Sequence, residues 1–249
     1  MNLDINLLKE KLYKEKFIQL DNILYNSEKL KRLAFDLGSG RTWNNLSIPG
    51  RKIINEDIIE IKTTHEKSSA GVGLIWHSDG TYENEVPLGN ILHITQAPSK
   101  GGSTQFVDTT EVLNRLPNSL YNDIKNLYSI HDQYKSWKLF RNSERYKIIV
   151  GNNSLKNEVI HPIIYKHPIT NNEILFVNKL MTKKIINVSE TESIKLLKIL
   201  FNYLYDEKYI KSLRANNNSI LIWDNIGTQH RAIHDYFPET RIGYRISFY

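Results

Sequence analysis

Apolar side chains near the start of the chain recur at helical spacing on both sides of one short strand. Ile5, Leu8 and Leu12 fall on one face of the first helix, as a 3.6-residue period requires. A second helix is expected to stop at Gly38 and Gly40 because glycine commonly ends helices. The elements expected here are a helix over 4–16, a strand over 17–20 and a helix over 27–37.

From Lys52 onward the pattern changes to short apolar or alternating runs separated by Gly, Pro, Asn and Asp. Such runs are typical of strands joined by turns. The expected strands are 58–62, 90–95, 104–107, 159–165, 174–177, 219–223 and 241–249. Many short strands with a few helices predict a mainly β protein with flanking helices, and favour a double-sheet barrel or jelly roll.

Two helical segments interrupt the strands. The first, 109–127, is expected to divide into two short helices at Pro117 because proline breaks a helix interior. The second, 189–205, opens with a capping box formed by Ser189 and Glu192. Its apolar stripe is expected to face the core and consists of Ile194, Leu197, Phe201 and Leu204.

The composition is that of an ordinary globular protein, with 249 residues, 40% of them hydrophobic and 24% charged. No repeat or long linker divides the chain, so one domain over 1–249 is expected. The chain has no run of eighteen apolar residues, and its first residues mix apolar and charged positions. These features predict neither a membrane span nor a signal peptide, and a cytoplasmic location is the expectation.

The formal net charge of +6 invites a nucleic-acid interpretation. The lysines are scattered, however, and no nucleic-acid-binding motif is present. A solvated basic surface that attracts small anions is the simpler interpretation. The expected partner is therefore a small molecule, with no nucleic acid and no membrane, and homo-oligomerisation is left open.

Two histidines and one aspartate form the strongest chemical pattern. His77 and Asp79 are two residues apart, so on a strand they point to one side. Alone this pair is weak, because such pairs often serve surface or turn hydrogen bonds. With His230 they make a 2-His-1-carboxylate set that leaves coordination positions open, whereas structural zinc prefers four protein ligands. The chain has no cysteine, so thiolate ligands are excluded.

The C-terminal strand alternates between two faces. Arg241, Gly243, Arg245 and Ser247 share one face, and the apolar side chains of the strand share the other. If the first face lines the interior, the two guanidinium groups need anionic partners because an unpaired buried charge is costly. The alternative is that this face is exposed to solvent.

These residues together resemble the taurine dioxygenase (TauD/TfdA) superfamily, in order from Phe17 to Tyr249. The matching motifs are His77-Ser78-Asp79, segment 98–106 (PSKGGSTQF), His161-Pro162, Phe176-Val177-Asn178, Trp223-Asp224-Asn225, Gln229-His230 and the pair Arg241 and Arg245. Several spaced motifs in order are more specific than any one of them.

The resemblance implies a double-stranded β-helix that holds Fe(II) through His77, Asp79 and His230. It also implies that 2-oxoglutarate, whose far carboxylate meets Arg241 and Thr104, is consumed with O2 and yields succinate and CO2. An Arg offers a bidentate fork to such a carboxylate. The alternatives are a zinc hydrolase with the same His/Asp/His ligands and a non-catalytic jelly-roll binding module.

Arg245 lies on the same strand face as Arg241 and is expected to anchor a small anionic substrate. The competing account is an ion pair between Arg245 and a protein carboxylate such as Asp224 or Glu83. Near the ligands, Asn225 and Gln229 either orient ligands or make ordinary turn hydrogen bonds.

Two positions bear on the reaction. Related halogenases carry a small residue where this chain has Asp79, so the carboxylate favours hydroxylation or another oxidation. Taurine dioxygenases usually carry an Asn shortly before the first ligand, but this chain has the glycine-rich stretch 68–75 there. That departure argues against taurine as substrate and suggests a mobile flap. The His230 and His234 spacing would suit helical zinc chelation, but the sequence after His234 predicts a loop.

Overall fold

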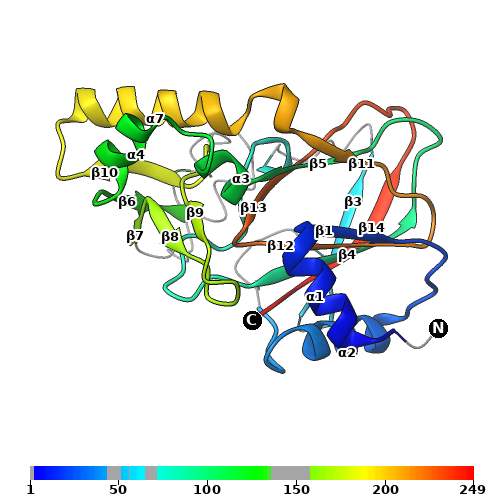
Figure 1. Cartoon of the computed structure of the whole chain (residues 1–249). Coiled ribbons are helices and arrows are strands. Elements are labelled where there is room, and N and C mark those ends of the chain that lie inside the picture. The colour runs from blue at the N-terminus through cyan, green and yellow to red at the C-terminus, as the bar shows by residue number, and fades with distance from the viewer. Residues whose placement is uncertain (1–2, 44–51, 56, 65–71, 134, 136–157) are drawn as a thin grey trace.

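Two antiparallel sheets face each other across the centre of the molecule (Figure 1). The computed structural model describes residues 3–43, 52–55, 57–64, 72–133, 135 and 158–249. Leu92 and Trp223 of the larger sheet meet Phe106 of the smaller sheet in one buried cluster. The Phe106 and Trp223 rings lie 5.7 Å apart in an edge contact. The chain is therefore mainly β with flanking helices, as expected.

The larger sheet contains the N-terminal strand and the C-terminal strand. Its strands, in spatial order, are β1 (Phe17–Leu20), β12 (Ser219–Asp224), β4 (Gly89–Gln96), β14 (Arg241–Phe248), β3 (Ile58–Thr63) and β2 (Lys52–Asn55). β14 pairs with both β4 and β3, and its register sets Arg245 opposite Leu92 of β4. The alternating C-terminal strand is thus an interior strand of the sheet, with Arg241 and Arg245 both buried.

The smaller sheet carries the strand that follows β12. It consists of β11 (Lys211–Leu213), β5 (Thr104–Asp108) and β13 (Thr228–Ala232). Two further small sheets extend the molecule on one side (Figure 1). They are formed by β10 (Thr182–Ile186), β6 (Tyr128–His131) and β7 (Val159–Pro162), and by β8 (Ile164–Lys166) with β9 (Glu173–Leu175).

The helices pack outside the sheets, and most of them begin at polar caps. The Asp4 side chain accepts hydrogen bonds from two amides of α1, and Ser189 accepts one from the Glu192 amide at the start of α7. Leu12 of α1, Leu30 of α2 and Phe248 of the larger sheet belong to one buried hydrophobic cluster. The helices are α1 (Ile5–Glu15), α2 (Ser27–Leu37), α3 (Thr109–Leu113), α4 (Asn118–Ile124) and α7 (Glu190–Leu204), with short 3-10 turns η1 (Val72–Leu74) and η2 (Glu207–Tyr209).

Most of the expected elements are confirmed, but the predicted stripe of α7 is wrong at one position. Ile194 is 62% exposed, whereas Ser193 is buried. The Ser193 hydroxyl accepts a hydrogen bond from the Ile185 amide at 2.8 Å. A polar side chain therefore faces inward because it satisfies a backbone donor, and the inward stripe continues through Leu197, Leu200 and Leu204.

Several strands were not expected from the sequence, because many of their buried positions are polar. Ser129 and His131 of β6, and Thr228 and Gln229 of β13, are all buried. An apolar pattern does not mark such strands. The strand expected over 159–165 is two strands in different sheets, and the Asn152 turn expected beside it lies outside the described residues.

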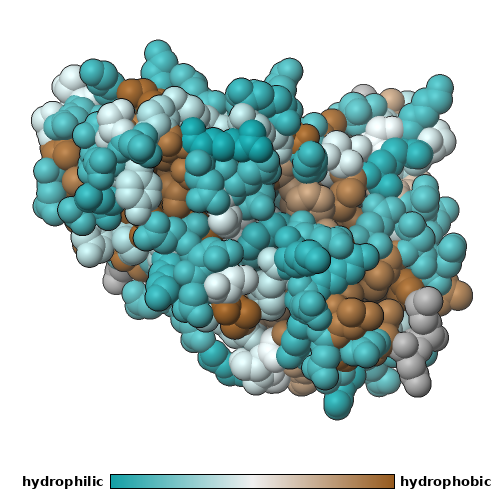
Figure 2. All heavy atoms as spheres, viewed as in Figure 1, coloured by the Kyte–Doolittle hydropathy of each residue, from teal (hydrophilic) through white to brown (hydrophobic). Residues whose placement is uncertain are grey.

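The surface agrees with a polar exterior. Figure 2 shows that the face viewed in Figure 1 is largely hydrophilic, with hydrophobic side chains in small separate groups. Within the ranges that the structure describes, no helix has the length and apolar character needed to cross a bilayer.

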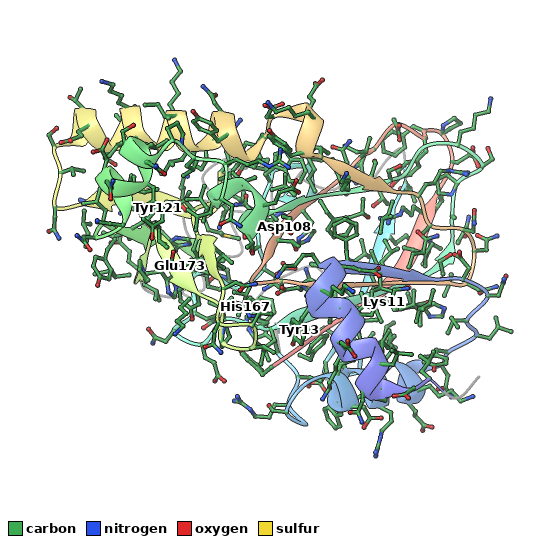
Figure 3. The ribbon with its side chains drawn as sticks, in the orientation of Figure 1. Lys11, Tyr13, Asp108, Tyr121, His167 and Glu173 are labelled. Carbon is green, nitrogen blue, oxygen red and sulfur yellow. The ribbon has the colours of Figure 1, made fainter. Side chains whose placement is uncertain are left out.

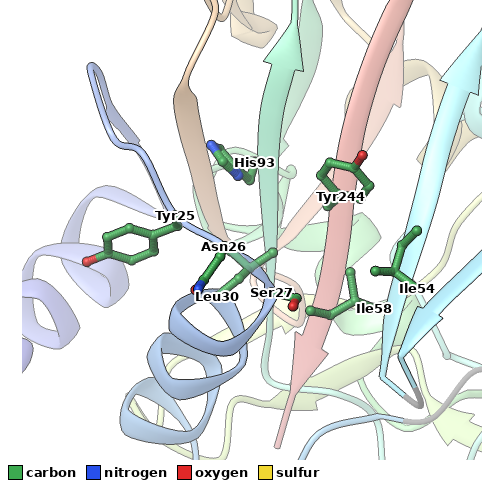
Figure 4. A pocket seen from close by; sticks show the side chains of 8 residues that line it. All are labelled: Tyr25, Asn26, Ser27, Leu30, Ile54, Ile58, His93 and Tyr244. Carbon is green, nitrogen blue, oxygen red and sulfur yellow. The ribbon is translucent and has the colours of Figure 1, made fainter.

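A pocket of about 180 Å³ lies between α2 and the outer face of the larger sheet (Figure 4). His93 at its wall bonds through Nε2 with the Ile23 carbonyl oxygen at 3.1 Å, and burial lowers the pKa of His93. The lining residues are Tyr25, Asn26, Ser27, Leu30, Ile54, Ile58, His93 and Tyr244. Its wall is thus mostly apolar, with a neutral imidazole.

A buried ion pair joins the end of α1 to the end of β12. Lys16 Nζ lies 3.0 Å from Asp224 Oδ2, and His167 Nε2 lies 2.9 Å from Asp224 Oδ1. Figure 3 shows Tyr13 beside His167, and their rings make an edge contact at 5.7 Å. Burial by itself would raise the pKa of Asp224, but His167 and Lys16 outweigh it and lower the pKa. The turn after β12 therefore depends on the N-terminal segment.

Replacing Lys16 with Met is expected to lower the free energy of unfolding by about 3 kcal/mol, because it leaves a buried carboxylate with one partner fewer. Urea denaturation measures this loss. Lys14→Met changes an exposed residue of the same helix and should stay within about 0.5 kcal/mol of the wild type.

The ion pair of Lys16 and Asp224 also makes the stability of the protein depend on pH. The pKa of Asp224 is lower in the folded protein than in the unfolded chain. The contribution of Asp224 to the free energy of unfolding is therefore full above its unfolded pKa of about 4, and it is lost as the pH falls through the folded-state pKa. The difference between wild type and Lys16→Met should therefore shrink in strong acid. Equal stability of the two proteins at neutral pH would contradict the role of this pair.

Candidate metal centre

Three potential metal ligands converge between the two sheets. His77, Asp79 and His230 are buried, and their candidate ligand atoms all lie within 4.8 Å of one another. His77 Nε2 is 3.8 Å from Asp79 Oδ1, and His230 Nε2 is 3.7 Å from Asp79 Oδ2. The structure therefore brings together the three residues expected to form one site.

Backbone pairing brings the two histidines together across a long stretch of sequence. The His77 amide donates to the His230 carbonyl oxygen at 3.2 Å, and the His230 amide donates to the His77 carbonyl oxygen at 2.8 Å. This isolated bridge adds His77 to the edge of β13. Two residues directly opposite on paired strands have neighbouring side chains, and the two imidazole centroids lie 4.3 Å apart.

Asn225 fixes the backbone of Asp79. Its Oδ1 accepts from the Asp79 amide at 2.8 Å, and its Nδ2 donates to the Asp79 carbonyl oxygen at 2.9 Å. Asn90 Nδ2 donates to the same Oδ1 at 3.0 Å. Of the two roles considered from the sequence, these hydrogen bonds favour orientation of the segment that carries the candidate ligand Asp79.

Gln229 holds the other side of the site. Its Nε2 donates to the Val177 carbonyl oxygen at 2.7 Å, and its Oε1 accepts from the Tyr205 hydroxyl at 2.8 Å. Sequence reasoning did not single out Tyr205. It lies at the end of α7 and outside every motif, so only the tertiary structure places it beside Gln229.

The electrostatics keep these groups in metal-binding forms. Burial lowers the pKa of His230 well below its usual value, so its imidazole is neutral. Burial pushes the pKa of Asp79 upward, but Arg245 and the two histidines outweigh it and hold that pKa below its usual range. His77 Nδ1 bonds with the Ile75 carbonyl oxygen at 2.7 Å, which fixes the tautomer that presents a lone pair at Nε2.

This donor set fits a divalent metal with open coordination positions. Two neutral imidazoles and one carboxylate suit Fe(II) and related ions. The cluster holds three candidate ligands among the described residues, whereas a closed structural zinc site would have four. His234 follows in the loop after β13 rather than on a helix, so helical zinc chelation with His230 does not occur.

Arg241 and Thr104 also meet, as expected. Arg241 Nη2 donates to the Thr104 hydroxyl at 3.2 Å. Both residues are buried, and burial lowers the pKa of Arg241. Arg241 forms no ion pair with any residue that the structure describes. A buried guanidinium of this kind requires an anion.

Arg245 contacts Asp79, one of the three candidate ligands, directly. Its Nη1 donates to both oxygens of Asp79, at 2.8 and 2.7 Å. The partner of Arg245 is thus Asp79 rather than Asp224 or Glu83. The Arg245 Nε is buried and has no hydrogen-bond partner among the described residues. Residues 68–71 of the stretch 68–75, which is expected as a flap, lie outside those residues.

The family follows from comparison of the whole chain. A family model described as "Taurine catabolism dioxygenase TauD, TfdA family" matches residues 1–247. This chain belongs to the TauD/TfdA family. The match confirms the resemblance that the spaced motifs carry.

Two relatives of this chain are named for their activities. An alpha-ketoglutarate-dependent sulfonate dioxygenase of Saccharomyces cerevisiae is 32% identical over 214 residues, which is 84% of this chain and 49% of that protein. An alpha-ketoglutarate-dependent sulfate ester dioxygenase of Pseudomonas putida is 26% identical over 178 residues, covering 69% of this chain and 58% of that protein. The chain thus spans about half the length of these relatives.

A solved structure is similar over the full chain. A taurine dioxygenase from Burkholderia xenovorans superposes with a TM-score of 0.80 at 20% identity, covering 100% of this chain and 83% of that one. A second solved chain from the same organism gives a TM-score of 0.81 at 21% identity. These likenesses show that the fold of this TauD/TfdA chain is that of taurine dioxygenase structures.

Replacing His230 with Ala is expected to weaken Co(II) binding more than about 100-fold, since losing even a group that only supports a ligand costs about 10–100-fold. Isothermal titration calorimetry measures the affinity. His234→Ala removes an imidazole four residues away and should leave the affinity within about twofold. Co(II) binding by His230→Ala at wild-type affinity would exclude His230 as a ligand.

Proposed function

We propose that this TauD/TfdA chain is an Fe(II)- and 2-oxoglutarate-dependent dioxygenase that oxidises a small anionic substrate. The observation that carries the proposal is the convergence of His77, Asp79 and His230 in a chain with a buried Arg241 that lacks an acidic partner among the described residues. The same proposal includes a double-stranded β-helix formed by the two facing sheets.

The residues of the chain supply binding, orientation and charge. Bound iron would supply dioxygen activation coupled to decarboxylation of 2-oxoglutarate to succinate and CO2. His77, Asp79 and His230 would hold the metal and leave positions for the co-substrates. The far carboxylate of 2-oxoglutarate would take the fork of Arg241 and the hydroxyl of Thr104, which already meet.

Charge balance favours an anionic substrate. Asp79 carries one negative charge, and Arg241 and Arg245 carry one positive charge each. A divalent cation and a 2-oxoglutarate dianion cancel each other, so the loaded site would keep one excess positive charge. A buried excess charge is costly, and a monoanionic group on the substrate would remove it.

Arg245 is proposed to be the residue that meets this group. It reaches Asp79 through Nη1 alone, and a guanidinium has five N–H donors. The relatives named for sulfonates and sulfate esters support an oxidised-sulfur anion as the substrate group. Both kinds of group present tetrahedrally arranged anionic oxygens, like those of the phosphates that Arg binds well.

Arg241→Ala is expected to weaken 2-oxoglutarate binding by about 2–5 kcal/mol, because a buried charge-assisted contact is lost. The measurement is anaerobic titration of the Fe(II)-loaded protein with 2-oxoglutarate, followed by the weak visible band of the chelate. Oxygen addition with a candidate substrate then tests succinate release.

Arg32→Ala, on the exposed face of α2, should titrate as the wild type does. A wild-type protein that forms no band and releases no succinate would contradict the dioxygenase proposal. Substrate hydrolysis by the zinc-loaded protein would then indicate a hydrolase, and ligand binding without turnover would indicate a binding module. An unchanged 2-oxoglutarate affinity in Arg241→Ala would remove Arg241 from the co-substrate site.

Arg245→Gln is expected to raise the KM for the best sulfonate or sulfate ester at least about tenfold, since a hydrogen bond to a charged group contributes about 1.5–3 kcal/mol. A substrate screen with matched neutral analogues, read by succinate release, identifies that substrate. Co(II) affinity is measured in parallel because Arg245 also contacts Asp79.

Arg41→Gln alters an exposed arginine and serves as the control. If neutral analogues are oxidised as well as the anions, or if Arg245→Gln changes Co(II) affinity but not KM, Arg245 supports Asp79 and does not anchor substrate.

A further inference from the structure

Tyr205 lies behind the metal centre and contacts the residues that precede both histidine ligands. We propose that Tyr205 is a positioning residue that holds the two imidazoles at the separation needed for one metal ion. The proposal rests on the metal site proposed above. Tyr205 itself acts through Trp76 and Gln229 rather than through contact with the metal.

The ring of Tyr205 fixes the first ligand segment. It stacks on Trp76 with centroids 5.4 Å apart and planes 8° from parallel. Trp76 is buried and directly precedes His77. Arg231, from the strand that carries His230, also lies over the Trp76 ring at 4.8 Å. Trp76 therefore has little freedom to tilt, and a tilt there would be passed to His77.

The hydroxyl of Tyr205 fixes the second ligand segment. It donates to Gln229 Oε1 at 2.8 Å and accepts from the Lys179 amide at 3.1 Å. Gln229 is buried and directly precedes His230. Burial raises the pKa of Tyr205, so the hydroxyl stays protonated and keeps its donor role at neutral pH. Both hydrogen-bonding functions of the hydroxyl are thus used.

Strand geometry explains why one residue can reach both segments. Successive side chains of an extended chain point to opposite sides, so Trp76 and Gln229 point away from the site when His77 and His230 point into it. α7 packs on that outer side, and Tyr205 is its C-terminal cap. One rigid ring at a helix end therefore spans two segments that are joined by the His77 and His230 backbone bridge.

The segment 177–180, which forms a turn beside Tyr205, supports the same arrangement. The Leu180 amide donates to the Trp76 carbonyl oxygen at 3.3 Å, and the Val177 carbonyl oxygen accepts from Gln229 at 2.7 Å. The Lys179 amide that donates to Tyr205 belongs to this turn. Tyr205, the turn and both ligand segments thus form one connected network, so loosening Tyr205 should change the spacing of the imidazoles.

Tyr205→Phe tests the proposal because it keeps the stacked ring and removes only the hydroxyl. Co(II) affinity is expected to fall about 10–100-fold, the range typical when a group supporting a ligand is lost. The visible d–d bands of bound Co(II) should also shift, because they report ligand geometry. A purely structural loss of stability would move neither readout in the folded protein.

Two further variants make the result decisive. Leu200 lies on the same helix and is fully buried, so Leu200→Ala opens a cavity beneath that helix. This variant should lower stability without changing the Co(II) affinity or the d–d bands of bound Co(II). Gln229→Met should weaken Co(II) binding, and adding Tyr205→Phe to it should cause little further loss, because residues acting through one contact are not additive.

Tyr205→Phe with Co(II) affinity within about twofold of the wild type and unchanged bands would overturn the proposal. An equal loss of Co(II) affinity in Leu200→Ala would also overturn it, as would fully additive losses of Co(II) affinity in the double variant. If the wild type binds Co(II) and releases succinate while Tyr205→Phe is unchanged, the positioning role alone fails. If the wild type binds no Co(II), the metal site fails with it.

Discussion

The buried carboxylate of Asp79 is the constraint on which the rest of the site depends. A charge removed from water is tolerated only when compensating groups surround it. Arg245 supplies two hydrogen bonds to it, and Asn225 holds its backbone from both sides. Because Arg245 lies on β14 and Asn225 follows β12, Asp79 can be compensated only where these strands flank β4. The strand order of the larger sheet therefore also places the groups that compensate Asp79.

A second buried carboxylate supports the same region from the other side. Asp224 ends β12 and is paired with Lys16, at the end of α1, and with His167. The Gly227 amide donates to Asp224 Oδ1 at 2.9 Å, and the Thr109 amide donates to the Gly227 carbonyl oxygen. The turn from β12 into β13 is thus fixed before His230 is reached. The N-terminal helix thus contributes to the placement of His230, a candidate ligand far away in sequence.

The sequence was sufficient for the features that carry a regular pattern. Alternation in 241–249 predicted that Arg241 and Arg245 share one face but left open whether that face is exposed to solvent, and the structure shows that both residues are buried. The spacing of His77 and Asp79, together with a distant His230, predicted three residues that do converge. In each case local chemistry and global fold agree, which is when sequence reasoning succeeds.

The rest could not be read from the sequence because it depends on tertiary partners. Ser193 faces inward only because the Ile185 amide needs an acceptor, and Tyr205 meets Gln229 only because α7 packs on that side. The bond between Arg245 and Asp79 joins positions that no periodicity relates. Sequence patterns record which face is apolar, whereas buried polar contacts are specified pair by pair.

The contact of Arg245 with Asp79 also connects metal and substrate in the proposed function. Arg245 donates to both Asp79 oxygens. A divalent cation held by Asp79 would compensate the same carboxylate, and the electrostatic need for Arg245 at that position would fall. The guanidinium could then turn its donors toward a substrate anion without leaving a buried charge unpaired. Arg245 would thus be able to serve both Asp79 and the substrate anion in the proposed site.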